Sequence, residues 1–161
     1  MSIQLLESAT SILSSQLNYF HQHKTKFLQA YYPKDSNAYR RADQALTVYA
    51  MIVATVLEDS VPDALDAMVF IGSRVEVELD FGSKYRKPTV HTCQIVFPHM
   101  MRENETEWIS FLSPVGMQLI LANKGDYLTI DTPDKIYRAY VKDFSFTGIG
   151  GHPERQAAIR V

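Results

Sequence analysis

The sequence predicts an α+β protein, in which an N-terminal antiparallel helical hairpin precedes an antiparallel sheet with one short helix. Two hydrophobic periods support this prediction, because apolar residues repeat every seven positions over the first sixty residues and alternate every second position from Phe70 onward. A third observation is the short uncharged segment 114–122, which stands between two alternating runs. We expect a coiled-coil hairpin over residues 1–61, a sheet domain over 68–147 and a tail over 148–161.

The first predicted helix runs from residue 3 to about residue 30, because neither Gly nor Pro interrupts this stretch. Pro33 disfavours helical geometry in the residue before it and therefore ends the helix. Two lines of residues seven apart are expected to form a coiled-coil seam. One line is Leu6, Leu13, Phe20 and Phe27, and the other is Ile3, Thr10, Leu17, Lys24 and Tyr31.

A second helix follows the turn at 31–37, and either Asp35 or Ser36 is expected to cap it. Two helices joined by about five residues pack antiparallel, so this half of the chain reads as a hairpin. A plain helical bundle is the alternative. The seven-residue lines of this helix are Tyr39, Leu46 and Val53 on one side and Ala42, Tyr49 and Val56 on the other.

The sheet begins with "RVEVELDF", where apolar and charged residues alternate as in a half-buried antiparallel strand. Val75, Val77, Leu79 and Phe81 share one face of this strand. Four more strands are predicted in "HTCQIVF", "EWISFLS", "YLTID" and "IYRAYVKDF", with the turn "TPDK" between the last two.

The short helix is predicted from "SPVGMQLILANKG". Ser113 is a suitable N-cap, and Pro114 suits the first helical position, where its missing N–H costs nothing. Gly125 is expected to adopt the left-handed conformation that ends the helix. The residues expected to lie on the sheet are Met117, Ile120 and Leu121.

Composition narrows the functional classes. The net charge of −2 shows no basic excess, which argues against duplex DNA as a partner. The lone Cys93 fits a reducing cytoplasm, and neither a signal peptide nor a membrane-spanning run is apparent. His21 and His23 face different directions on a helix, while His91 and Cys93 lack further ligands nearby, so no metal site is predicted.

Five short motifs in order resemble the C-terminal domain of the Gre transcription elongation factors over residues 69–144. They are Gly72-Ser73, Ile95-Val96, Ser113-Pro114-Val115-Gly116, Gly125-Asp126 and Thr132-Pro133. The resemblance implies an FKBP-like fold after a coiled-coil hairpin. The chain departs from the family pattern at Leu121, where Gly is usual, and at Asp134-Lys135. The tail with Gly148, Gly150 and Gly151 extends beyond the family core and is expected to dock loosely.

The resemblance also implies a partner, bacterial RNA polymerase, whose secondary channel receives the hairpin. In the family, two tip carboxylates spaced Asp-x-x-Glu help to hold the polymerase's magnesium ion. The tip residues here are Asp35, Ser36 and Asn37, so Asp35 is the only tip carboxylate and is expected to be a weak ligand for the polymerase's magnesium ion. The chain is expected to need no cofactor of its own. Ser113, Pro114 and Gly116 are the expected polymerase-docking residues.

Other functions stay open at this point. A prolyl isomerase would need an aromatic-lined pocket, which Phe81, Tyr85, Phe97 and Trp108 are available to form. A non-cleaving regulator similar to the nucleoside diphosphate kinase regulators, or a homodimeric scaffold, is a further alternative. No catalytic residue is predicted, so the chain is expected to act on another enzyme rather than to be one.

Overall fold

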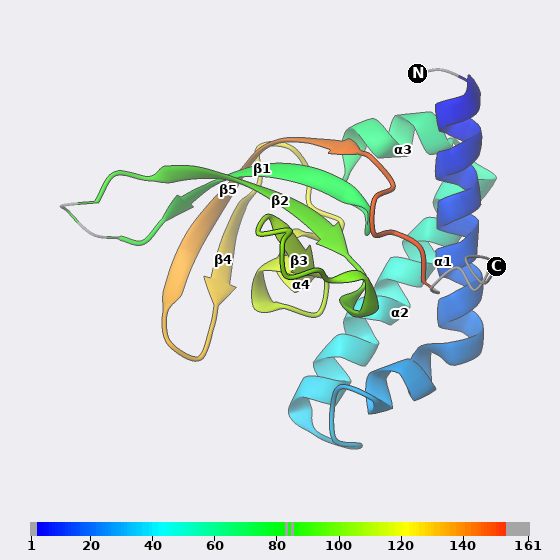
Figure 1. Cartoon of the computed structure of the whole chain (residues 1–161), viewed down its shortest axis with the longest axis horizontal. Coiled ribbons are helices and arrows are strands. Elements are labelled where there is room, and N and C mark those ends of the chain that lie inside the picture. Colours follow the sequence, from blue (N-terminus) through cyan, green and yellow to red (C-terminus); the bar gives the residue numbers. More distant parts are fainter. Residues whose placement is uncertain (1–2, 83, 85, 154–161) are drawn as a thin grey trace. The chain divides into compact units, whose positions relative to one another are not determined.

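The structure is a computed structural model that describes residues 3–82, 84 and 86–153 of the 161-residue chain. The chain divides into two compact units between Ala64 and Leu65. The first unit is helical and the second contains a curled five-stranded sheet with a short helix, as Figure 1 shows. The predicted α+β class is therefore confirmed.

The helical unit is formed mainly by α1 (Ile3–Gln29) and α2 (Asn37–Glu58). From Gln16 to Lys24 the residue numbers rise along α1, while those of their partners in α2 fall from Tyr49 to Asp43. The two helices therefore run antiparallel, as predicted. A third short helix, α3 (Val61–Ala67), occupies the segment between the two predicted domains.

The predicted seam is correct for α2 and half correct for α1. Leu13, Phe20 and Phe27 are buried, but the second α1 line is only partly correct: Ile3 and Tyr31 are 76% and 45% exposed, while Thr10, Leu17 and Lys24 are half-buried. The buried residues beside the Leu13 line are instead Ala9 and Gln16, one position earlier in the sequence. In a helix, the residues three positions and four positions before Leu13 and Phe20 both lie beside them, so either set can complete the seam. The sequence pattern alone does not select between the two sets.

A buried hydrogen bond shows that the side of α1 with Gln16 faces α2. The Tyr49 hydroxyl donates to Gln16 Oε1 at 2.6 Å, and both side chains are fully buried. Nearer the tip, Lys24 Nζ lies 2.9 Å from Asp43 Oδ1 and donates to Thr47 Oγ1 at 2.6 Å. These two cross-links fix the register of α1 against α2.

The sheet has the strand order β3-β2-β1-β5-β4. The strands are β1 (Ser73–Asp80), β2 (Thr89–Val96), β3 (Trp108–Ser110), β4 (Tyr127–Asp131) and β5 (Ile136–Phe146). Every neighbouring pair is antiparallel except β2 and β3, which are parallel, so the expectation of a wholly antiparallel sheet is wrong at this edge. The cause is the connection from Phe97 to Glu107, which crosses back before β3 begins, as a parallel pair requires.

The short helix α4 (Pro114–Leu119) begins as predicted, with the Gly116 N–H donating to Ser113 Oγ at 3.0 Å. It ends earlier than expected, at Leu119, because Leu121 already has a left-handed conformation at φ +68°. Gly125 has the predicted positive φ, at +90°, but lies beyond the end of the helix. Val115 packs on a core of Ile130, Tyr137 and Ala139. Leu119, which the sequence prediction missed, is fully buried, whereas Met117 is only half-buried.

Residues 147–151, which we call the glycine strap, are bonded to the sheet unit, so the expected loose docking is wrong for them. The Gly148 N–H donates to Gly72 O at 2.9 Å, and the Phe97 N–H donates to Gly150 O at 2.9 Å. The buried amide of Gln94 donates from Nε2 to Gly72 O, Thr147 Oγ1 and Ile149 O. The rest of the predicted tail, residues 154–161, lies outside the described residues.

Candidate functional site

The turn of the hairpin presents the predicted tip residues. Pro33, Lys34, Asp35 and Ser36 form a tight turn, closed by the Ser36 N–H donating to Pro33 O at 3.1 Å. Asp35 is the third residue of this turn and has φ +64°, a left-handed conformation that Asp and Asn tolerate better than other side chains except Gly. The left-handed turn is therefore one reason for an Asp at position 35, in addition to its predicted role as a magnesium ligand.

Of the two expected caps, Ser36 is the one used. Its Oγ accepts the Tyr39 N–H at 3.1 Å, so the capping alternative for Asp35 is wrong. Asn37 Oδ1 lies 3.5 Å from Arg40 Nη1, which gives it a local partner. Asp35 and Lys34 are both exposed, and no other carboxylate occurs between residues 30 and 38. The tip thus offers one carboxylate with a neighbouring ammonium.

The aromatic residues before the turn close the end of the hairpin. The Tyr31 ring lies 5.2 Å from the Phe27 ring, and 45% of the residue is exposed. Tyr32 is half-buried, and this burial raises the pKa of its hydroxyl above the ordinary value. Tyr31 is therefore the more exposed of the two tyrosines before the turn.

A lone carboxylate binds a hard cation weakly, because such ions prefer several oxygen ligands. Within the described residues, no group of three or more His, Cys, Asp and Glu side chains is placed to hold a metal ion. Asp35 as a ligand for the polymerase's magnesium therefore stays a prediction that needs ligands from outside this chain.

The Ser113-Pro114-Gly116 motif has clear structural roles. Ser113 Oγ donates to Ser110 O at 2.7 Å while it accepts the Gly116 N–H. Gly116 is buried, and a Cβ there would overlap Ser110 O and lie 2.9 Å from Phe111 Cα. Pro114 is the exposed member, so the prediction of docking at this motif depends mainly on Pro114.

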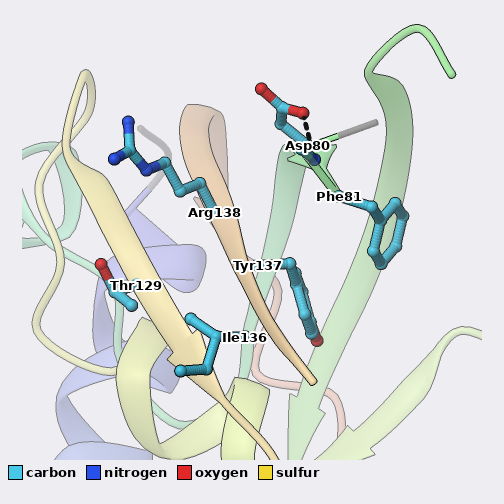
Figure 2. Close-up of a pocket in the computed structure, with 7 residues that line it drawn as sticks. Asp80, Phe81, Thr129, Ile136, Tyr137 and Arg138 are labelled. Atoms are coloured by element: carbon cyan, nitrogen blue, oxygen red, sulfur yellow. Dashed lines mark hydrogen bonds between the residues drawn. The ribbon is translucent and has the colours of Figure 1, made fainter. Parts of the chain in front are cut away.

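The aromatic residues considered for an isomerase pocket are in different surroundings. Phe81 lines a hollow of about 370 Å³, in which Figure 2 shows its ring beside that of Tyr137. Phe97 is fully buried and meets Phe111 edge to face at 5.0 Å. Trp108 lies under the Arg102 guanidinium at 5.6 Å, and Tyr85 falls outside the described residues. The hollow beside Phe81 is lined by neither Phe97 nor Trp108.

Cys93 and His91 lie on the inner face of β2, opposite Val75 and Val77 of β1. Burial raises the pKa of the Cys93 thiol above its ordinary value, and the charge of Glu107 raises it further. His91 Nε2 is 2.7 Å from Thr89 Oγ1. A protonated, half-buried thiol is a poor nucleophile, so Cys93 is better understood as a packing residue.

Fold and site together define a two-unit α+β protein whose candidate functional residues lie on the exposed turn of a helical hairpin. The family model for the transcription elongation factor GreA/GreB C-terminal domain matches residues 64–146, just over half of the chain. The chain therefore belongs to the GreA/GreB family of transcription elongation factors.

Solved structures of three bacterial proteins are similar to the chain. The transcription elongation factor GreA/GreB from Nitrosomonas europaea is 18% identical, with 60% of this chain and 79% of that chain covered and a TM-score of 0.42. GreA factor homolog 1 (Gfh1) of Thermus thermophilus is 23% identical, with coverages of 85% and 94% and a TM-score of 0.40. Gfh1 of Thermus aquaticus is 22% identical, with coverages of 86% and 95% and a TM-score of 0.41.

No curated protein matches the chain. None of the described helices combines the length and the apolar character needed to cross a bilayer.

Proposed function

We propose that this protein binds bacterial RNA polymerase and modulates elongation from the secondary channel. Family membership supports the partner, and the helical hairpin supports the mode of action. At 27 residues, α1 forms a rod of about 40 Å, long enough to reach deep into a channel. The sheet unit would dock on the polymerase through the exposed Pro114, and the hairpin would enter the channel with Asp35 at its tip.

The observation that supports an inhibitory effect is the single tip carboxylate. A second carboxylate would add a ligand and a formal negative charge to a magnesium site, whereas here Ala38 stands three residues after Asp35. Lys34 places a positive charge beside the remaining ligand. We therefore propose that the protein occupies the channel with little stimulation of transcript cleavage, and that it competes with factors that do stimulate it.

Binding to the polymerase core enzyme tests the partner. Labelled protein should be retained by immobilised core enzyme at micromolar concentration, and Pro114→Ala should weaken this retention. Gln118→Ala is the matched control, because it changes another exposed residue of α4 and should have no effect. Absence of retention of the wild-type protein at these concentrations would contradict the proposed function.

A competition experiment tests the channel. Addition of the protein to a reaction that contains a cleavage-stimulating factor should lower the rate of transcript cleavage in proportion to the protein bound. The same experiment with a hairpin-deleted chain should show no competition if the hairpin enters the channel. Competition that persists without the hairpin would place the blocking contact in the sheet unit.

A further inference from the structure

The face of the sheet opposite α4 presents an ordered set of polar and aromatic side chains, which we call the outer face. Strand alternation puts Val75, Val77 and Leu79 on the inner face and Glu76, Glu78 and Asp80 on the outer face. Cross-strand register then defines two rows on the outer face. The first is Val90, Glu78, Tyr140 and Tyr127, and the second is Asp80, Arg138 and Thr129.

The first row ends in an aromatic platform. Tyr127 is 76% exposed, and its ring lies 4.7 Å from that of Tyr140 with 36° between the planes. Beside it is a hollow of about 340 Å³. The hollow is lined by Glu78, Asp80, Pro88, Tyr127, Arg138 and Tyr140. An exposed tyrosine supported by a second ring, next to a hollow of this size, suits a planar ring such as a nucleobase.

The same end of the sheet gathers positive charge. The loop 81–88 and the segment 131–138, together with Asp80, contain five cationic side chains and three carboxylates. The cations are Lys84, Arg86, Lys87, Lys135 and Arg138, and the carboxylates are Asp80, Asp131 and Asp134. Lys135 Nζ lies 4.4 Å and Arg86 Cζ 5.9 Å from the centre of the Phe81 ring. Because Phe81 packs with the inner-face cluster of Tyr137 and Ala139, these two cations lie at the end of the sheet, beyond the outer face itself.

These five cations have no carboxylate partner within the described part of the chain, whereas other cations of the sheet do. Arg74 pairs with Glu107, Lys124 with Asp143 and Lys142 with Glu76. Asp80, the carboxylate opposite Arg138, instead accepts the Gly82 N–H at 2.9 Å. Charge complementarity therefore points to an anionic partner for this end of the sheet, despite the overall charge of −2.

We propose that the outer face binds single-stranded nucleic acid, with a base stacked on Tyr127, a phosphate at Arg138 and the next phosphates at Lys135 and Arg86 around the end of the sheet. Glu78 and Asp80 lie beside the platform, where their oxygens would accept hydrogen bonds from exocyclic amino groups. The site therefore favours cytosine over uracil. An acidic protein segment fits less well, because it would face Glu78 and Asp80 and leave the tyrosine platform unused.

Fluorescence anisotropy of the full-length chain with labelled oligonucleotides of about twelve residues tests this site. Oligo(C) should bind at micromolar concentration near 50 mM salt and more tightly than oligo(U), in both RNA and DNA forms. Equal affinity for the two forms would mean that base and phosphate are read, whereas tighter RNA binding would mean that the 2′-hydroxyl is read as well. Both outcomes support the site, and neither depends on polymerase binding.

Single substitutions separate the contributions. Tyr127→Ala should weaken binding about tenfold with an unchanged salt dependence, because stacking is lost and charge is not. Arg138→Ala should reduce the slope of log affinity against log salt by about 0.7, the value of one phosphate contact on a single strand.

The control variant Arg74→Ala removes an arginine of the same face that is paired with Glu107, and it should change neither the affinity nor the salt dependence. Glu78→Ala should strengthen oligo(U) binding and narrow its difference from oligo(C).

Two results would overturn the proposal. One is the absence of binding by any oligonucleotide at about 100 µM protein, the weak end of non-specific affinities. The other is binding that is insensitive to Tyr127→Ala and is matched by polyglutamate of equal length, which would assign the patch to acidic protein segments. Circular dichroism of each variant confirms that the exposed substitutions leave the fold intact.

Discussion

The two units of this protein are stabilised in different ways. In the helical unit, side chains from two helices meet along a seam, and one buried side-chain hydrogen bond joins Gln16 to Tyr49. In the sheet unit, main-chain groups at Gly72 and in the glycine strap close the structure, with Gln94 bonding three of their acceptors. The first unit should therefore respond to changes of side-chain chemistry, and the second to changes of backbone freedom.

The largest effect is expected at Gly150 in the glycine strap. Its φ is +72°, and an added Cβ would overlap the side chain of Val96. Gly150→Ala should lower the free energy of unfolding by about 3 kcal/mol, since the left-handed strain and the clash add together. Gly82→Ala is the matched control: its φ is +76° but nothing lies within 4 Å, so it should cost only about 1–2 kcal/mol. Equal losses in urea denaturation would show that the strap is not closely packed.

A smaller effect is expected in the hairpin. Tyr49→Phe removes one hydrogen bond between fully buried groups and should cost about 1–2 kcal/mol. The double variant Tyr49→Phe, Gln16→Leu should recover most of this loss, because both partners become apolar. A double-mutant cycle by urea denaturation measures the coupling, and additive losses would mean that the two side chains do not interact.

The turn after α4 tests backbone strain at a single residue. Leu121 has φ +68° while its N–H donates to Val69 O at 2.7 Å, so the chain cannot relax without losing this bond. Leu121→Gly should be more stable than Leu121→Ala by about 1 kcal/mol, since both variants lack the side chain and only Gly is free of the left-handed penalty. If thermal denaturation ranks Ala above Gly, the left-handed assignment is wrong.

Cys93 offers a reporter for one unit alone, since it is the only thiol of the chain and lies in β2. Because burial raises its pKa, its reaction with a disulfide reagent should be slow and should rise with pH only above the ordinary range of a thiol. Gly150→Ala should accelerate this reaction by opening the sheet unit, and Tyr49→Phe should leave it unchanged. Acceleration by both variants would mean that the two units open together.

Elements with a regular hydrophobic period could be predicted from the sequence, and the contacts that complete them could not. The strand of Val75, Val77 and Leu79 and the cap at Ser113 follow local rules, and both are found. The observed α1 seam contains Ala9 and Gln16 in place of the predicted residues one position later. The sequence does not predict this, because the polar Gln16 gives no hydrophobic signal. The close packing of the glycine strap could not be predicted, because Gly occurs both in flexible segments and where the backbone approaches another group closely. Only the position of Val96 against Gly150 shows that the second case applies.

The candidate site shows the same limit. The tip turn was located correctly because Pro33 is a strong local signal, but the left-handed conformation of Asp35 was not foreseen. The cations at this end of the sheet are not predicted from the sequence, because they come from two segments about fifty residues apart, Arg86-Lys87 and Lys135–Arg138, in a chain of net negative charge. Their meeting depends on the pairing of β1 with β5.

Transcript cleavage in backtracked elongation complexes tests the central claim most directly, with wild type, Asp35→Asn and Ala38→Glu compared. Asn keeps the left-handed turn while it removes the charge, and Glu at position 38 lies in the first turn of α2, where an acid is compatible with the helix dipole. We predict weak or no stimulation by wild type and by Asp35→Asn, and a gain with Ala38→Glu. Strong wild-type cleavage that survives Asp35→Asn would contradict the account.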